Sequence, residues 1–206
     1  MQHTRTAGLT FLLALACGTP AMAQTFTVSG GGSAVTATGT ASGTAKASDT
    51  PPPAQTVIDD AVKTAKAEHK TVFVHVGASW CGWCHKLEAM LHSTEVGPVI
   101  ATYYVLAPLD ALENADKKSL ENPGVDAVMK SLDFKGGPPM FAFLDADGKK
   151  IASSFALAPN NDNIGYPGSP TEIQTFGELL KKTAPKMTDA DWTKIMDYLH
   201  KNAPKQ

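Results

Sequence analysis

Two cysteines and a histidine in the segment 79–86, with the sequence SWCGWCHK, are the residues whose types and spacing could do chemistry. Cys81 and Cys84, three positions apart, could form a redox-active dithiol. Together with His85 they also make Cys-x-x-Cys-His, the pattern that attaches a c-type haem and supplies a histidine ligand to its iron. The elements around the motif have to decide between the two chemistries.

The spacing of the two cysteines suits disulfide chemistry if the motif opens a helix. Cysteines three apart in a first helical turn lie close enough for an S–S bond, and the free N–H groups and positive dipole end favour a thiolate there. Cys81, the first of the pair, is therefore expected to be the nucleophile. Cys84, further into the helix and less exposed, is expected to resolve the mixed disulfide.

The segments on either side of the motif predict a strand that leads into a helix. Residues 71–78 (TVFVHVGA) form a short, nearly continuous apolar run, typical of a central strand covered on both faces. Beyond the motif, one face of a helix is marked by four apolar residues: Trp83, Leu87, Met90 and Leu91. The cysteines are thus predicted at a strand-to-helix junction, which does not fit the mostly helical wrapping that a haem needs.

The rest of the chain beyond residue 53 adds strands and helices to this unit. Asp147-Gly148 marks a hairpin turn, and the SPTE sequence of residues 169–172 is a capping box with proline at the first helical position. We expect helices at 54–69, at 124–134, from 169 and from 188, and strands at 102–109 and, as a hairpin, within 140–155. This pattern predicts one α/β domain, residues 54–206, that ends in a helix.

Two stretches of this domain resemble thioredoxin-fold proteins. VFVHVGASWCGWCHKLE is similar to the strand, active-site turn and helix of that family, and GGPPMFAFLDADGKKI resembles its segment in which a cis-proline begins a strand beside the dithiol. The resemblance implies a thioredoxin-like fold, with a central mixed sheet flanked by helices and here an extra C-terminal helix. It also implies a thiol–disulfide oxidoreductase in which Cys81 and Cys84 form the redox-active disulfide and Pro139 is the cis-proline.

Some residues depart from the usual pattern of that family. The dipeptide between the cysteines is Gly82-Trp83 rather than Gly-Pro, and Trp83 could either shape a substrate groove or pack on the surface. Pro138 lacks the N–H that the residue before the cis-proline usually offers to an extended substrate, so docking should lose one hydrogen bond. We expect Trp80, Gly82, Trp83 and Pro138 to contact the substrate.

Two histidines near the motif have open roles. His75 stands where many thioredoxins bury an aspartate that handles the proton of the second cysteine. It could be a core histidine satisfied by a hydrogen bond, or its neutral ring could accept the proton of Cys84, which would make it catalytic. His85 lies one helical turn beyond Cys81, where it could approach that sulfur or remain a surface residue.

The first 53 residues predict an export segment followed by a linker. Arg5, the apolar run after it and the small residues at 21–23 resemble a secretory signal peptide, residues 1–23. Cys17 offers an alternative, the lipidated cysteine of a bacterial lipoprotein. Residues 24–53, dominated by Gly, Ser, Thr and Ala, are predicted to be a disordered linker, with a weak hairpin as the alternative. We expect a periplasmic or secreted protein, anchored to a membrane only if Cys17 is lipidated.

Composition narrows the partners further. The formal net charge of −2 gives no electrostatic footprint for nucleic acid, and two remaining cysteines are too few for a structural disulfide framework. We expect no cofactor and no metal, exported cysteine-containing proteins as substrates, and a membrane electron donor if the protein is a net reductant. A reducing or isomerising role is favoured, because no cation directly precedes the motif and Trp80 and Trp83 flank it with apolar surface.

Two other functions compete with disulfide exchange. A noncatalytic binding module would use the groove around Pro139 and the polar loop 157–168, although the intact cysteine pair argues against it. A haem or metal carrier would use Cys81, Cys84 and His85. An absorption spectrum of the purified protein separates the classes, because bound haem gives a Soret band.

Overall fold

The computed structural model describes residues 50–155 and 162–204. The predicted signal peptide, Cys17, almost all of the predicted linker and part of the loop 157–168 lie outside the described residues. Those described belong to one compact unit, residues 46–206. Among them, no helix has the length and apolar character that crossing a membrane requires.

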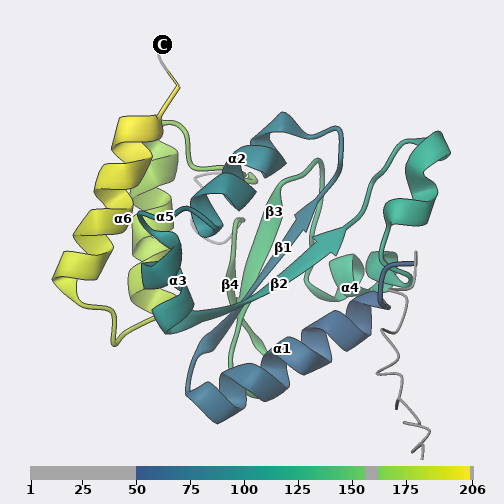
Figure 1. The fold of residues 1–206 in the computed structure, drawn as a ribbon, viewed down its shortest axis with the longest axis horizontal. Coiled ribbons are helices and arrows are strands. Elements are labelled where there is room, and N and C mark those ends of the chain that lie inside the picture. Colours follow the sequence, from purple (N-terminus) through teal and green to yellow (C-terminus); the bar gives the residue numbers. More distant parts are fainter. Residues whose placement is uncertain (1–49, 156–161, 205–206) are drawn as a thin grey trace, which may run out of the picture. The chain divides into compact units, whose positions relative to one another are not determined.

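A mixed four-stranded sheet, in the order β2-β1-β3-β4, forms the centre of this unit (Figure 1). β1 (Thr71–Gly77) pairs in parallel with β2 (Tyr104–Asp110) and antiparallel with β3 (Met140–Leu144). β3 in turn pairs antiparallel with β4 (Lys150–Ser153). The five inner residues of β1 are all buried, so the prediction of a central strand from the apolar run is confirmed.

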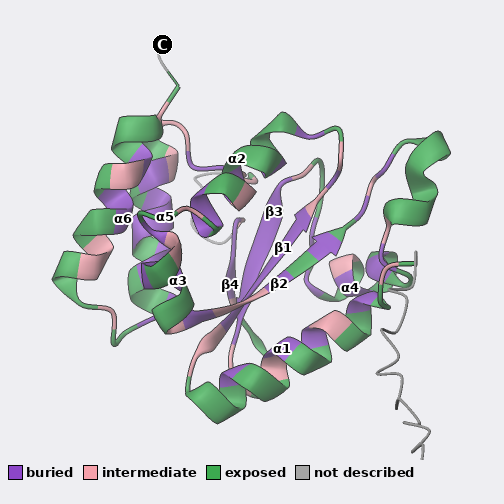
Figure 2. Ribbon diagram, viewed as in Figure 1, coloured by how far each residue is buried: buried purple, intermediate pink, exposed green. Residues whose placement is uncertain are grey.

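Helices cover both faces of the sheet. The bounds of the six α-helices are α1 (Ala54–Glu68), α2 (Gly82–Leu91), α3 (Gly97–Tyr103), α4 (Val125–Ser131), α5 (Pro170–Thr183) and α6 (Asp189–Asn202). One apolar core lies between the sheet and α1 and α4, and a second lies between the sheet and the other four helices. Figure 2 shows the buried residues in the strands and along the inward faces of the helices.

Side chains of β1 alternate between these two cores, as expected for a strand covered on both faces. Val72, Val74 and Val76 belong to the core under α1 and α4, and Phe73 belongs to the core under α2, α5 and α6. His75 therefore faces the same side as Phe73, toward α2. This alternation brings the histidine under the helix that carries the cysteine motif.

Three details differ from the pattern expected from sequence. Thr102 and Tyr103, predicted to begin a strand, are instead the last residues of α3, and β2 starts at Tyr104. The connection from β2 to α4 contains a 3-10 helix, η1 (Ala115–Leu120), that no pattern predicted. α4 is shorter than expected and ends at Ser131, two residues before Asp133 takes a left-handed conformation with φ of 58°.

Candidate active site

Cys81 and Cys84 form a disulfide where β1 leads into α2, with Cα atoms 5.2 Å apart. Cys81 is the N-cap residue of α2, and its Sγ accepts a hydrogen bond from the backbone N–H of Cys84 at 3.1 Å. After reduction, the same N–H and the helix N-terminus would stabilise negative charge on the Cys81 sulfur. The two cysteines are equally buried, at 4% and 5% exposed, so position rather than exposure distinguishes the predicted nucleophile from the predicted resolver.

The Pro138–Pro139 segment lies against this disulfide. The peptide bond between the two prolines is cis, as the resemblance implies, and the carbonyl oxygen of Pro138 lies 3.5 Å from the Cys81 Sγ. Asn163 holds the segment, because its Nδ2 donates to the carbonyls of Gly137 at 3.1 Å and Pro139 at 2.8 Å. Asn163 was not among the residues expected at the site, since it lies in an irregular loop without a motif.

Trp83 borders a groove beside the disulfide. Its indole is half-exposed and stacks on Tyr166, with ring centroids 5.9 Å apart. The groove has a volume of about 480 Å³, and its walls include Trp83, Tyr166, Pro138 and Pro139. Trp83 therefore packs on Tyr166 and also lines a groove, and its role in binding a substrate stays a prediction. Gly82 is exposed, and no atom lies within 4 Å of the place where a Cβ would be.

His75 is buried at 3% exposed, and its ring has one bonded and one free nitrogen. Nδ1 lies 3.0 Å from Oε1 of Glu88, whereas Nε2 has no hydrogen-bond partner among the described residues. Burial, and to a lesser degree the charge of His92, lowers the pKa of His75 to about 4, so the ring is neutral at pH 7. Because a carboxylate only accepts, Nδ1 donates to Glu88 and Nε2 remains a bare acceptor.

A small cavity connects this histidine to the second cysteine. It has a volume of about 100 Å³ and is lined by residues that include His75, Cys84, Glu88 and Asp110. Burial raises the pKa of Glu88 and, together with the charge of Glu113, that of Asp110. Cys84 thus shares a cavity with one neutral base and two carboxyl groups, which is an arrangement that can receive its proton.

His85 is an exposed residue that bonds to the active-site turn. Its Nε2 lies 3.0 Å from the backbone carbonyl oxygen of Ser79, which only accepts, so this nitrogen donates. The exposed side chain thus bonds main chain of the turn before Cys81. Within residues 50–155 and 162–204, no three His, Cys, Asp or Glu side chains gather into a cluster that could hold a metal ion.

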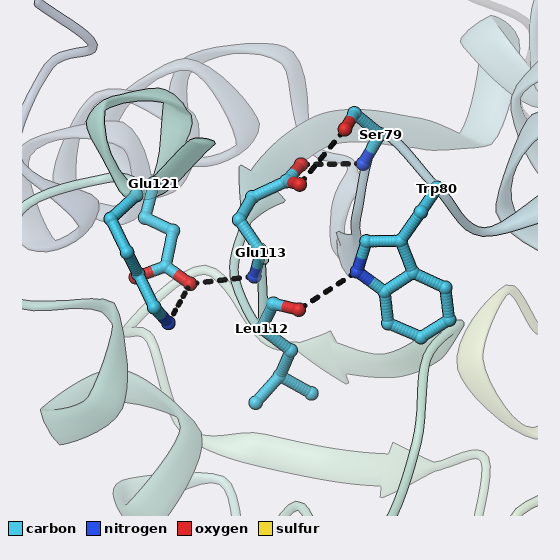
Figure 3. A network of polar contacts seen from close by, with 6 residues as sticks. Ser79, Trp80, Leu112, Glu113 and Glu121 are labelled. Atoms are coloured by element: carbon cyan, nitrogen blue, oxygen red, sulfur yellow. Dashed lines mark hydrogen bonds and ion pairs between the residues drawn. The ribbon is translucent and has the colours of Figure 1, made fainter. Parts of the chain in front are cut away.

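Trp80, the residue before the nucleophile, is tied to the segment that follows β2 (Figure 3). Its half-exposed indole donates from Nε1 to the carbonyl of Leu112 at 2.9 Å. Next to it, the buried carboxylate of Glu113 accepts hydrogen bonds from the backbone N–H and the hydroxyl of Ser79. Sequence reasoning missed Glu113, because its partner lies 34 positions away and no local pattern marks the pair.

Comparisons with known proteins match this chain to one protein family and to a curated relative. The family model Thioredox_DsbH, described as a protein of unknown function, DUF255, matches residues 45–200. An uncharacterized protein of Caenorhabditis elegans is 31% identical over 124 residues, which are 60% of this chain and 16% of that protein. The chain therefore spans less than a fifth of the length of that curated relative.

Solved structures with a similar fold include one described as a disulphide isomerase and one described as an oxidoreductase. A disulphide isomerase from Xylella fastidiosa Temecula1 is 21% identical, with a TM-score of 0.42, over 72% of this chain and 89% of that one. A structure described as DsbH oxidoreductase is 20% identical, with a TM-score of 0.41, over 60% of this chain and 81% of that one.

Proposed function

This chain belongs to the Thioredox_DsbH family (DUF255), and we propose that the Cys81–Cys84 pair of its thioredoxin-like fold exchanges disulfides with cysteines of exported proteins. The proposal covers this activity, that of a thiol–disulfide oxidoreductase, together with its substrates, its direction and its compartment. One observation carries the exchange chemistry: the Cys84 N–H is aimed at the sulfur of Cys81, which caps α2 beside the Pro138 carbonyl.

In the reducing direction, the Cys81 thiolate attacks one sulfur of a substrate disulfide and releases the other as a thiolate. Cys84 then attacks the Cys81 sulfur of the mixed disulfide, which releases the second substrate thiolate and leaves the Cys81–Cys84 disulfide. Two electrons pass from the dithiol to the substrate. The proton of Cys84 leaves through the cavity that this cysteine shares with Nε2 of His75 and with the carboxyl groups of Glu88 and Asp110, whose pKa values burial raises.

The roles of the two cysteines are tested by comparing Cys81→Ser with Cys84→Ser. Cys81→Ser should abolish exchange, whereas Cys84→Ser should leave an attacking thiol without a resolver and accumulate mixed disulfides. Mass spectrometry of each variant after incubation with a disulfide-containing protein and with oxidised glutathione measures the trapped adducts. Equal trapping by both variants would show that the assignment of nucleophile and resolver is wrong.

A reducing or isomerising direction is supported by the charges around the dithiol. Glu88 and Asp110 line the cavity that Cys84 shares, and the buried Glu113 bonds the residue two positions before Cys81. Negative charge near a cysteine sulfur disfavours the thiolate form of that cysteine. A dithiol whose thiolate is weakly stabilised forms a disulfide that resists reduction, so the dithiol acts as a reductant.

The direction is tested by equilibrating the protein with glutathione and by titrating Cys81. We expect a reduction potential well below about −120 mV, the value of the strong oxidant DsbA, and a pKa for Cys81 well above about 4. A potential near −120 mV together with a pKa near 4 would overturn the proposed direction.

Export and compartment complete the proposal. Residues 1–23 have the composition of a signal peptide, with lipidation at Cys17 as the alternative, so we propose that the mature chain lies in the periplasm or outside the cell. A net reductant there needs a membrane electron donor to keep its dithiol reduced. This is tested by expressing the full chain, determining the N-terminus of the mature protein and measuring the cell fraction in which it is found. A protein that stays in the cytoplasm with residues 1–23 still attached would contradict the proposal.

A further inference from the structure

We propose that Glu113 is a positioning residue for disulfide exchange: its buried carboxylate holds Ser79 and thereby sets the position of the Cys81 sulfur. This inference rests on the proposed function, since it concerns the same dithiol. Glu113 touches neither sulfur, and the cysteine motif alone does not reveal it. Four structural observations support the assignment.

The first is the burial of the carboxylate itself. Glu113 is 4% exposed, and its two oxygens accept from two donors on one residue, the backbone N–H and the hydroxyl of Ser79. A buried carboxylate is costly without such partners, and hydrogen bonds to a charged acceptor are the stronger kind. The bidentate contact therefore restrains both the main chain and the side chain of Ser79 (Figure 3).

The second is that the contact extends the pairing of β1 and β2 into the active-site turn. Beyond the strands, the Ala111 N–H donates to the carbonyl of Gly77 at 2.9 Å, and Trp80 donates to Leu112. The segments 77–80 and 111–113 are thus joined step by step. Cys81 is the next residue, and its own N–H donates to the carbonyl of Ala78 at 3.0 Å.

The third is the backbone of Leu112, which has a φ of 58°. A left-handed conformation is unfavourable for a residue with a branched side chain, and it persists only where surrounding contacts impose it. Here those contacts are the bonds of Leu112 and Glu113 to Trp80 and Ser79. Such strain is a feature of functional sites, where a fixed geometry has a use.

The fourth observation is a second carboxylate, that of Glu121, which bonds the main chain of Glu113. Glu121 accepts from the backbone N–H of Glu113 at 2.7 Å and from Nζ of Lys118 at 2.7 Å. The bond from Lys118 lowers the pKa of Glu121, so this carboxylate stays charged at neutral pH. The turn around η1 therefore closes on Glu113 and supports the bond that Glu113 makes to the active-site turn.

Positioning matters here because an exchange reaction needs the attacking sulfur in line with the disulfide that it attacks. A displacement on the scale of an ångström is enough to slow such a reaction severely. Without Glu113, Ser79 would lose the acceptor of its N–H. It would keep the bond that its carbonyl accepts from His85 at 3.0 Å and a longer one that its hydroxyl accepts from Lys117 at 3.4 Å. We therefore expect the loss of Glu113 to lower the rate of attack by Cys81 in protein that is still folded.

The test compares three variants of the reduced protein in their second-order rate of reaction with a small aromatic disulfide. Glu113→Ala should slow the reaction by about tenfold or more, whereas Glu113→Gln should stay within about threefold of wild type, because the amide keeps an acceptor for the Ser79 N–H. Asp116→Ala removes an exposed carboxylate from the same loop and should change nothing. The thiol pKa of Cys81 is measured alongside, as is the folded fraction by circular dichroism.

Rescue by glutamine distinguishes positioning from the charge alone. If Glu113→Gln were as slow as Glu113→Ala, or if a folded Glu113→Ala reacted at the wild-type rate, the proposal would be wrong. Should Glu113→Ala not fold, Ser79→Ala decides: it removes one of the two bonds and should slow the reaction by about twofold to fivefold. In that case either of two results would overturn the proposal. One is a wild-type rate for Ser79→Ala, and the other is a rate for Glu113→Gln below about a tenth of the wild-type rate.

The failure of this proposal differs from failure of the proposed function. If the wild-type protein reacted no faster than Cys81→Ser, disulfide exchange itself would be refuted. If the wild type reacted rapidly and Glu113→Ala equally so, only the role of Glu113 would be refuted.

Discussion

The buried imidazole of His75 should make the folded protein sensitive to mild acid. The unfolded chain takes up a proton on this ring as the pH falls through its ordinary pKa of 6.5, whereas the folded chain resists until a pH of about 4. Between these values the unfolded state binds more protons, so the free energy of unfolding falls as the pH falls. Above about pH 7.5 the ring is neutral in both states and makes no pH-dependent contribution.

The size of this effect follows from the two pKa values. Each pKa unit corresponds to about 1.4 kcal/mol, so the interval from 6.5 to about 4 predicts a loss of roughly 3 kcal/mol between pH 7.5 and pH 4. Glu88 and Asp110 act in the opposite direction, because their raised pKa values let the folded state bind protons first. The pH dependence of the wild type alone therefore mixes contributions of both signs.

The assay isolates His75 by comparing the wild type with His75→Gln, whose amide stays neutral and can still donate to Glu88. Urea unfolding of the oxidised proteins at pH 7.5 and at pH 4 gives the free energy of unfolding at each pH. The wild type should lose about 3 kcal/mol more than the variant between the two. The reasoning would be refuted if the losses of the two proteins differed by less than about 1 kcal/mol. An NMR titration in which His75 of the folded protein was protonated near pH 6.5 would refute it as well.

Two further predictions concern the helical layer and the N-terminal segment. A Cβ at Gly177 would lie 2.9 Å from Cε of Met196 and 3.0 Å from Cζ2 of Trp192, so Gly177→Val should cost about 1–3 kcal/mol by urea unfolding. Wild-type stability in this variant would contradict close packing of α5 on α6. Deleting residues 24–45 should change the free energy of unfolding by less than about 0.5 kcal/mol, because the segment has few large apolar side chains. A loss of several kcal/mol would mean that it packs on the domain.

The parts of the fold that local sequence determines were predictable. The mostly apolar run 71–78, rich in β-branched side chains, indicated the central strand, and Ser169 with Glu172 indicated a capping box, which the structure confirms at the start of α5. The thioredoxin-like fold and the family are likewise confirmed. In each case the signal lies within a few neighbouring residues, so one sequence is enough to detect it.

The errors arose where one pattern suits two structures or where the partner is distant. The run from Val99 to Leu106 consists almost entirely of aliphatic and aromatic residues, so periodicity alone could not show that a helix gives way to a strand at Tyr104. Glu113 and Asn163 lie in irregular segments, and what they hold is main chain, whose position depends on the whole fold. The roles predicted for Trp80, Gly82, Trp83 and Pro138 in binding substrate remain predictions.

Pro108 bears on how copies of this chain behave at high concentration. It lies in β2, the outermost strand on its side of the described sheet, opposite His75 in the register with β1. Edge strands can recruit a strand from another molecule through their outward main-chain groups, which is a common route to aggregation. A proline in this strand has no N–H, so the outward main-chain donors of β2 that an incoming strand would bond are interrupted at Pro108, in the second half of the strand. The edge of the sheet beside the redox site is thereby a poor template for growth into larger assemblies.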